Sequence, residues 1–245
     1  KKGVAEAASL AVCNRTPAKC ARFAARGVRV MDSIAALAQG CDIVFLSVKP
    51  QNYAQVLGEL APAGGAEKIV VSIAAGISTE YIRGELGAGC RVVRATPNTP
   101  LLLGCGATAL SRGPGVGDAD FAKVQSVFAA GGEVAVLPED QMNAVIAVNG
   151  SSPAYVYLFV KAVMDGAAQQ GIDPGTAKRL ICQTLTGSAA MVMRSGMEPD
   201  ELIRQVSSPG GTTLKALEAL REHHFEQGII DAMARCTARA EELGR

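Results

Sequence analysis

The stretch Asp42-Ile43-Val44-Phe45-Leu46-Ser47-Val48 is a nearly continuous apolar run of strand length. Runs of this kind are typical of parallel strands that helices cover on both faces. Similar apolar segments occur at residues 69–73 and 91–95, and segments with helical signals separate the three. Because strands and helices alternate at this spacing, the sequence predicts an α/β fold with a doubly wound, Rossmann-like parallel sheet.

The second half of the sequence has a different pattern, and we expect no strand after residue 139. Proline and Asp-Pro at segment starts and glycine at segment ends mark helices there, which we expect at residues 140–147, 153–171, 174–195, 199–206, 212–221 and 225–243. The sequence thus predicts a dinucleotide-binding domain at residues 1–138 and an all-α domain at residues 139–245. Because this helical half is apolar on several faces, we expect it to pack against a second copy of itself.

The composition excludes several classes of function. Lys and Arg number 24 against 23 Asp and Glu, so there is no basic excess of the kind that nucleic-acid binding requires. The most membrane-like stretch, residues 154–163, includes Lys161 and is far shorter than the roughly 20 apolar residues of a membrane span. We therefore expect a buried helix at this stretch, and neither nucleic acid nor membrane as a partner.

The cysteines and histidines indicate no metal site. The seven cysteines are scattered without C-x-x-C spacing, which is typical of reduced thiols in a cytoplasmic protein. His223 and His224 are adjacent, and neighbouring residues on a helix point in different directions. Such a pair makes a poor set of ligands for one metal ion.

The expected nucleotide site lacks one of its usual parts. A dinucleotide fold holds the pyrophosphate on a glycine-rich turn after its first strand, but no G-x-G-x-x-G precedes Asn14. The first strand that we expect is residues 10–13, so this chain is predicted to lack the first βα unit. Asn14-Arg15-Thr16 then stands where NAD sites carry Asp or Glu. An amide, a guanidinium and a hydroxyl suit the 2′-phosphate of NADPH, although a solvated basic helix start would look the same.

Two later loops are candidates for the rest of the cofactor site. Val48-Lys49-Pro50 and Ala74-Ala75-Gly76 follow the expected ends of two parallel strands. Ligands of such sheets bind at the carboxyl ends of the strands. Lys49 is therefore placed to meet a phosphate or a ribose, unless it is an ordinary surface lysine.

The segment Val206-Ser207-Ser208-Pro209-Gly210-Gly211-Thr212-Thr213-Leu214 joins a glycine turn to an expected helix start. Two glycines let the backbone approach a ligand closely. Free amides at a helix start bind small anions such as a carboxylate. A helix that is merely capped by Ser and Thr would have the same composition, and the string alone leaves both interpretations open.

The order of these segments resembles that of the pyrroline-5-carboxylate reductases. Residues 206–213 resemble the substrate loop of that family throughout. Further strings that resemble it are Asn14-Arg15-Thr16, Val48-Lys49-Pro50, Ser72-Ile73-Ala74-Ala75-Gly76, Arg94-Ala95-Thr96-Pro97-Asn98-Thr99-Pro100 and Asn149-Gly150-Ser151-Ser152-Pro153-Ala154-Tyr155. In the last string the family has Ser-Gly-Ser-Gly-Pro-Ala-Tyr, so Asn149 and Ser152 depart from its pattern. Ser33 stands where the family often has Asn near the adenine ribose, which is a weaker match.

The resemblance implies NADPH-dependent reduction of 1-pyrroline-5-carboxylate to L-proline, with an active site shared in an interlocked homodimer that could associate further. The helical half would then be the dimerisation and substrate domain. Thr213 and Ser208 are the implied catalytic residues, and the implied substrate-binding residues are Val206, Gly210, Gly211 and Thr212. The implied cofactor-binding residues are Asn14, Arg15, Thr16, Ser33, Val48, Lys49, Pro50, Ala74, Ala75, Gly76 and Asn98.

Two alternatives remain open on the sequence. One is another NADP-linked oxidoreductase of the β-hydroxyacid dehydrogenase type, which relies on a lysine in the long helix. Lys161 and Lys178 are the lysines available there, and neither stands in a matching motif. The other is a dimer that binds nucleotide without catalysis.

Overall fold

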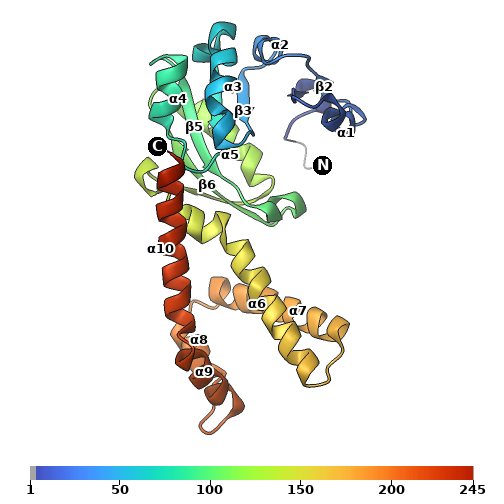
Figure 1. Cartoon of the computed structure of the whole chain (residues 1–245), viewed down its shortest axis with the longest axis vertical. Helices are drawn as coiled ribbons and strands as arrows, with labels where there is room; N and C mark the ends of the chain where they lie inside the picture. The colour runs from blue at the N-terminus through green and yellow to red at the C-terminus, as the bar shows by residue number, and fades with distance from the viewer. Residues whose placement is uncertain (1–3, 245) are drawn as a thin grey trace. The chain divides into compact units, whose positions relative to one another are not determined.

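The computed structural model describes residues 4–244, which form two compact units. The first unit comprises the residues up to 151 together with those from 234 onward, and the second comprises residues 152–233. Contacts therefore group residues 139–151 and the end of the chain with the α/β part, although the sequence pattern changes near residue 138. Figure 1 shows both units with the chain coloured from blue to red.

The first unit contains a sheet of five strands within the described residues, in the order β3-β4-β5-β6-β7. Their bounds are Ile43–Leu46, Ile69–Ser72, Arg91–Thr96, Gly106–Arg112 and Gly132–Val136. β3, β4 and β5 are parallel, whereas β6 is antiparallel to β5 and parallel to β7. The connection from β5 to β6 holds only a short 3-10 helix, Thr99–Leu103. Because a parallel crossover needs a dozen or more residues, this short connection turns β6 back beside β5.

The strands β1 (Ala11–Val12) and β2 (Arg29–Val30) form a separate parallel pair. Among the described residues, neither is hydrogen-bonded to the five-stranded sheet, and β3 is paired only with β4. No glycine-rich turn precedes β1 in the printed sequence. A βα unit that carries the glycine-rich turn of the predicted dinucleotide fold stays a prediction.

Both faces of the sheet are covered by apolar side chains. The unit's helices are α1 (Ala21–Ala24), α2 (Ile34–Gln39), α3 (Tyr53–Leu60), α4 (Thr79–Leu86) and α5 (Asp118–Ala129). Val70 of β4 lies in one core with Leu57 and Ile82, while its neighbour Val71 lies in another core with Val124. Successive residues of a strand face opposite sides of the sheet. The apolar run of β4 is therefore buried from both sides, whereas Phe45 of β3 is 38% exposed. The predicted Rossmann-like α/β class is confirmed, but a fully parallel sheet was wrong, because β6 and β7 run antiparallel to the other three strands.

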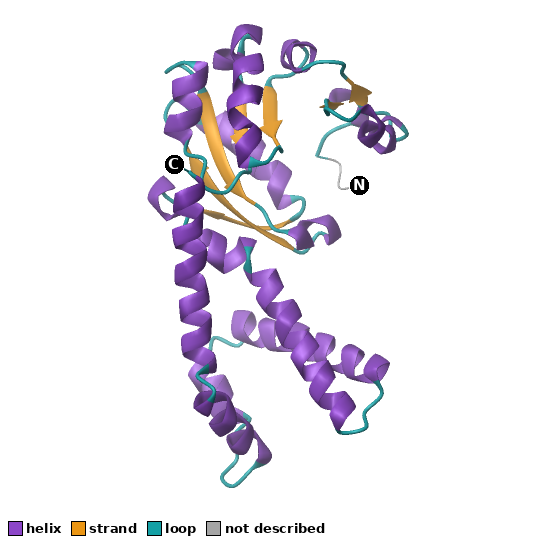
Figure 2. Ribbon diagram, in the orientation of Figure 1, coloured by secondary structure: helices purple, strands orange, loops and turns teal. Residues whose placement is uncertain are grey.

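The second unit is helical (Figure 2). It consists of α6 (Ser152–Gln169), α7 (Pro174–Arg194), α8 (Pro199–Gln205), α9 (Thr212–Glu222) and the first part of α10 (Phe225–Leu243). These bounds agree with the predicted helices to within two residues. The helix predicted at residues 140–147 is wrong in form: a 3-10 helix, Glu139–Gln141, and a π-helix, Ile146–Gly150, occupy this region.

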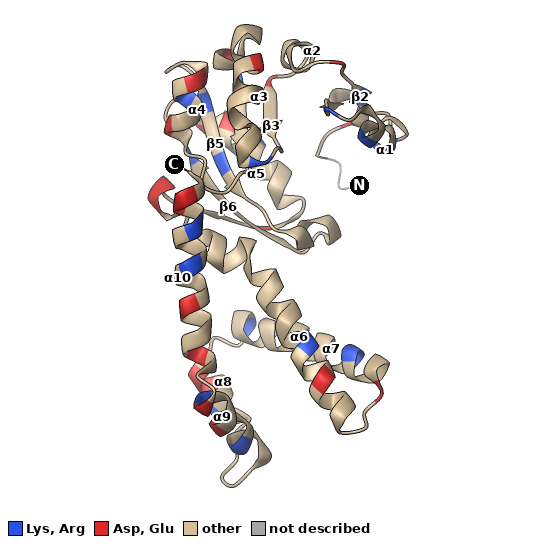
Figure 3. Cartoon of the chain, in the orientation of Figure 1, with Lys and Arg blue, Asp and Glu red and all other residues tan. Residues whose placement is uncertain are grey.

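The helices of the second unit expose apolar side chains in the single chain, namely Val156, Tyr157, Leu158, Leu180, Met191, Val192 and Met193. Figure 3 shows few charged residues along α6 and α7, and the charged residues of α6 are Lys161 and Asp165. The helix predicted to be buried at residues 154–163 is thus exposed in the single chain. Among the described residues, no helix is long and apolar enough to cross a membrane.

Candidate active site

Three loops lie at one edge of the sheet, because β3, β4 and β5 are parallel and end on the same side. They are residues 48–50 after β3, residues 74–76 after β4 and residues 97–98 after β5. Each was predicted to bind the cofactor. Ala74 and Gly76 are buried, whereas Lys49 is exposed. This edge therefore offers backbone groups and small side chains, with one mobile cation beside them.

A buried tyrosine holds the first two strand ends together. Tyr53 of α3 is 1% exposed, and its hydroxyl donates to the carbonyl oxygen of Leu46 at 3.0 Å. The same hydroxyl lies 2.9 Å from the Oγ of Ser72. Leu46 and Ser72 are the last residues of β3 and β4. Burial raises the pKa of Tyr53, so the hydroxyl stays protonated and serves as a clamp where both loops begin.

Two asparagines hold the end of β5. The Nδ2 of Asn149, from the π-helix, donates to the carbonyl oxygens of Thr96 at 2.6 Å and Ala107 at 2.8 Å. Asn98 accepts from the amide of Ala107 and donates to the carbonyl oxygen of Asn149. Both ends of the Asn98 side chain therefore bond inside the fold. Its predicted direct bond to the cofactor remains a prediction.

The third buried polar group is Arg94 of β5, which is 3% exposed. Its Nη1 lies 3.5 Å from Glu139, and its Nη2 donates to the Oδ1 of Asn143 at 2.5 Å. Burial lowers the pKa of this guanidinium, and the carboxylate of Glu139 partly offsets that effect. Arg94 pairs in register with Ser72. It therefore anchors the segment after β7 to the middle of the sheet.

A separate pocket of about 430 Å³ lies after β1 and is lined by Val12, Asn14, Ala18, Lys19, Cys20, Arg22 and Phe23. Lys19 and Arg22 add two positive charges to the predicted Asn14. The Oδ1 of Asn14 accepts from the amide of Thr16, and Arg15 is exposed without lining the pocket. An amide and two cations suit a phosphate dianion. Lys19 and Arg22 were not among the predicted cofactor residues, although Lys19 follows the Asn-Arg-Thr segment by only one turn.

Ser33 has a local role in the structure. Its Oγ accepts from the amide of Ala36 at 3.1 Å and caps α2. This is the usual behaviour of a serine before a helix, and contact with the adenine ribose stays a prediction.

The predicted substrate loop is a tight turn at the start of α9. Gly210 has a φ of +69°, and the amide of Gly211 donates to the carbonyl oxygen of Ser208 at 2.9 Å. A Cβ on Gly211 would lie 2.6 Å from the Oγ of Ser208, so the turn requires glycine there. The helix begins at Thr212 without a side-chain cap.

The hydroxyls of this turn divide into two kinds. Ser207 donates to the carbonyl oxygen of Ile203 at 2.6 Å. The hydroxyls of Ser208, Thr212 and Thr213, by contrast, form no hydrogen bond with any residue from 4 to 244. Thr213 is half-buried beside the free amides of the first helical turn. These groups are therefore available to a small anionic ligand.

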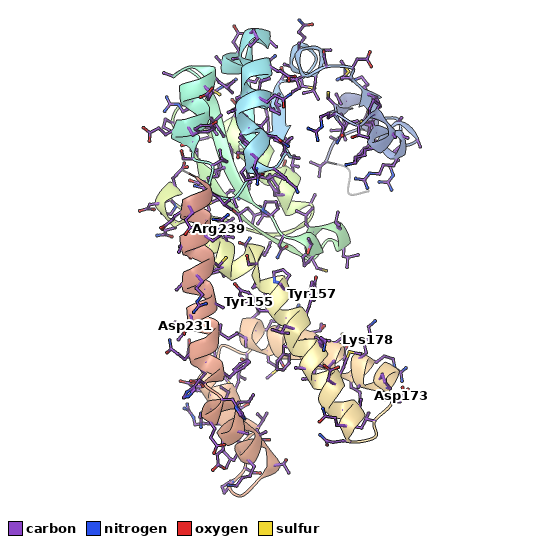
Figure 4. All side chains as sticks on the ribbon, viewed as in Figure 1. Tyr155, Tyr157, Asp173, Lys178, Asp231 and Arg239 are labelled. Carbon is purple, nitrogen blue, oxygen red and sulfur yellow. The ribbon has the colours of Figure 1, made fainter. Side chains whose placement is uncertain are left out.

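The lysines that a β-hydroxyacid dehydrogenase would need are placed differently. Figure 4 labels Lys178 on α7 and Tyr155 and Tyr157 on α6. Lys178 is exposed, and Lys161 pairs with Asp165 at 2.5 Å on the surface of α6. Among the described residues, no group of three or more His, Cys, Asp or Glu could hold a metal ion.

Similarity to known proteins extends over nearly the whole chain. Residues 139–243 match the family described as pyrroline-5-carboxylate reductase dimerisation, and residues 1–76 match the family described as NADP oxidoreductase, coenzyme F420-dependent. The chain is 37% identical to the pyrroline-5-carboxylate reductase of Escherichia coli K12 over 219 residues, which are 89% of this chain and 81% of that protein. The chain belongs to the pyrroline-5-carboxylate reductase family.

Other members of the pyrroline-5-carboxylate reductase family extend this result. Pyrroline-5-carboxylate reductase 3 of mouse is 34% identical over 243 residues, which are 99% of this chain and 89% of that protein. The crystal structure of the Plasmodium falciparum pyrroline carboxylate reductase with NADP bound has a TM-score of 0.93 at 27% identity. The match covers 100% of this chain and 90% of the Plasmodium falciparum chain. The family and the fold predicted from the sequence are thus confirmed.

Proposed function

We propose that the chain catalyses the NADPH-dependent reduction of 1-pyrroline-5-carboxylate to L-proline, the last step of proline biosynthesis. The observation that carries this proposal is the start of α9. There Ser208, Thr212 and Thr213 offer free hydroxyls beside free helix amides and a glycine turn, within the described residues. A small carboxylate with a ring nitrogen matches such a set of groups.

Different residues of the loop would hold different parts of the substrate. Amides at Gly211, Thr212 and Thr213 would hold the carboxylate, because the start of a helix attracts anions. The hydroxyl oxygen of Thr213 would accept a hydrogen bond from the protonated ring nitrogen, with Ser208 as a second contact and Val206 and Gly210 shaping the turn. An imine is readily protonated near neutral pH, so positioning carries the reaction and little dedicated acid catalysis is needed.

NADPH, when bound, supplies the hydride. The pocket at Asn14, Lys19 and Arg22 would hold its 2′-phosphate, and Arg15, Thr16 and Ser33 are further expected contacts. The loops that contain Val48, Lys49 and Pro50 and Ala74, Ala75 and Gly76 would hold the nicotinamide side. The buried contacts of Tyr53 hold the strand ends that lead into these loops, and those of Asn149 hold the end of β5.

The oligomeric state that we propose is based on the helices of the second unit. The family domain at residues 139–243 is a dimerisation domain, and we place the dimer contact on the apolar helices of residues 152–233. Dimers that associate into larger oligomers are a further expectation. We place the protein in the cytoplasm, because the described cysteines are all free thiols, as a reducing compartment allows.

A rate assay tests the function. NADPH oxidation is followed with pyrroline-5-carboxylate and, as a control, NADP reduction is followed with a short β-hydroxyacid. The chain is assayed beside a form extended at its start with a strand and a glycine-rich turn of the dinucleotide-binding type. We expect turnover of pyrroline-5-carboxylate by the extended form. Turnover of the hydroxyacid would favour the dehydrogenase alternative, and NADPH binding without any turnover would favour a non-catalytic dimer.

A further inference from the structure

The loop of residues 74–76 touches a segment that is distant in the sequence. Gly76 is buried and has a φ of +80°. A Cβ at this position would lie 2.5 Å from the carbonyl oxygen of Ala240 and 2.8 Å from the amide nitrogen of Gly244. Both residues belong to the same compact unit as the loop. The backbone of the loop therefore packs directly on the backbone at the end of α10.

The contact is reciprocal. A Cβ on Gly244 would overlap the carbonyl oxygen of Gly76 and lie 3.0 Å from its carbonyl carbon. Ala240, in the last turns of α10, is 3% exposed. The two glycines thus allow a close approach that a side chain at either position would prevent. Glycine at an approach of this kind is required on both sides.

The rest of the loop explains why such a support is needed. β4 fixes the chain up to Ser72, and the side chain of Ser78, which accepts from the amide of Tyr81, fixes the start of α4. Between these two anchors Ile73 and Ile77 pack in the cores, and the residues from Ala74 to Gly76 have short side chains or none. Glycine gives a backbone more conformations than any other residue. The contact with α10 limits this freedom.

We infer that the end of α10 is a positioning element for the cofactor, and that Ala240 and Gly244 are positioning residues that hold the loop of residues 74–76 in its binding shape. This inference rests on the proposed function, because it takes the loop to be part of the NADPH site. The first part of α10 belongs to the second unit. Its last residues would thus support a loop of the proposed cofactor site.

The test uses two pairs of variants in the full chain, in its extended form. Gly244→Ala removes the close approach, and Gly58→Ala is its control because a Cβ on this α3 residue meets nothing within 4 Å. Gly76→Ala adds both a clash and a strained φ. Gly64→Ala is its control, since Gly64 has a φ of +83° and its nearest neighbour, the Oε2 of Glu67, is 4.0 Å away.

Three measurements are made on each variant: the Kd of NADPH, hydrogen exchange of the amides of residues 74–78, and the urea unfolding curve. For Gly244→Ala we expect faster exchange in this segment and an NADPH Kd raised about tenfold, the loss that one well-placed hydrogen bond accounts for. Gly58→Ala should match the wild type in exchange and in Kd, and should unfold at a higher urea concentration because alanine favours a helix more than glycine does. Gly76→Ala should raise both the exchange rate and the NADPH Kd more than Gly64→Ala does.

Two results would overturn the inference. One is that Gly244→Ala and Gly58→Ala have the same exchange and the same Kd. The other is that exchange rises in Gly244→Ala while the Kd stays unchanged, because the contact would then be structural only. Failure of the proposed function looks different, since it is seen in the wild-type protein as missing turnover of pyrroline-5-carboxylate.

Discussion

The carboxylate of Glu139 is shared by two elements of the sheet domain, and Arg94 provides the charge that it meets. The Oε1 of Glu139 lies 3.5 Å from the Nη1 of Arg94 and accepts from the amide of Thr79 at 2.9 Å. Thr79 is the first residue of α4, directly after the loop that holds Gly76. One side chain thus joins β5, the start of α4 and the segment that leads out of β7.

Glu139→Gln should destabilise the first unit. The guanidinium of Arg94 is buried and would lose its ion pair, although the Oε1 of glutamine still offers a hydrogen-bond acceptor. Because the side chain of Glu139 is 33% exposed, water relieves part of the penalty. We expect a loss of about 1–3 kcal/mol in the free energy of unfolding, measured in urea. Glu133→Gln, at an exposed position of β7, is the control, and an equal loss there would contradict the role of Glu139.

Thr213→Val should lower turnover. The substitution keeps the shape of the side chain and removes the hydroxyl that is proposed to meet the ring nitrogen. One positioning hydrogen bond is worth roughly 1–1.5 kcal/mol, so we expect a drop in kcat of about tenfold or more. The NADPH Kd should stay nearly the same. Steady-state kinetics beside Thr212→Val, with folding checked by thermal melts, measures this effect, and an unchanged kcat would make the loop a helix start only.

Lys19→Ala and Arg22→Ala should reduce the preference for NADPH over NADH. Both side chains line the pocket at Asn14, and a lost charge-assisted bond to phosphate costs about 1.5–3 kcal/mol. From the sequence we expect the same effect for Arg15→Ala. Because Arg15 does not line the pocket, we expect its effect to be smaller than that of the other two variants. Kd values for both cofactors separate the three variants. Equal weakening of NADPH and NADH would show that none of these residues binds the 2′-phosphate.

The start of α7 should be sensitive to acid. The Oδ2 of Asp173 accepts from the amide of Thr176 at 2.8 Å, and this bond lowers the pKa of Asp173 below its ordinary value of 3.8. A lowered folded-state pKa stabilises the protein above the unfolded pKa, and that contribution is lost as the pH falls through the folded pKa.

Asp173→Asn isolates this charge, because asparagine caps a helix almost as well as aspartate. We expect wild type to be more stable than the variant at neutral pH and the difference to shrink below about pH 4. Unfolding curves from neutral pH to about pH 2.5 measure the difference. A difference that stays constant over this range would show that the charge contributes nothing.

Leu158→Glu should weaken the dimer. Leu158 is 68% exposed in the single chain and lies between exposed Tyr157 and the rest of the apolar surface of α6. Obligate dimers bury on the order of 2,000 Å² or more, and a carboxylate inside such a surface is costly. Sedimentation at micromolar concentration should show a dimer for wild type and monomer for the variant. Lys161→Ala is the control, because it removes a charge and places none on the apolar surface. We expect this variant to stay dimeric.

The helices could be predicted closely because their signals are local. Pro174 after Asp173 marks the start of α7, and Asp173 caps the helix as expected. The start of α9 after Gly211 is another signal within one turn. The direction of β6 could not be predicted in this way, because strand pairing is a tertiary property. The π-helix of residues 146–150 likewise depends on the bonds of Asn149 to β5 and β6.

The loops of the candidate site could be predicted from the sequence, but the buried side chains that hold these loops could not. Sequence strings identified residues 74–76 and 206–213 because glycines and hydroxyl residues stand together there. Nothing local marks Tyr53 as the clamp of two strand ends or Arg94 as a buried cation. Their roles arise from partners 19 and 45 residues away in the sequence. The pocket cation Arg22 was hidden for the same reason, since a short 3-10 helix and α1 bring it beside Asn14.

Asn149 limits how this chain can change in evolution. Its one amide nitrogen serves two main-chain oxygens, of Thr96 and Ala107, at a position where the family pattern has serine. A single hydroxyl has one hydrogen to donate, so a change from asparagine to serine would strand one of these oxygens, at a cost of about 1–3 kcal/mol. A lineage that makes this change must also gain another donor, such as a buried water molecule. The identity of residue 149 and the hydration of the β5–β6 junction must therefore change together.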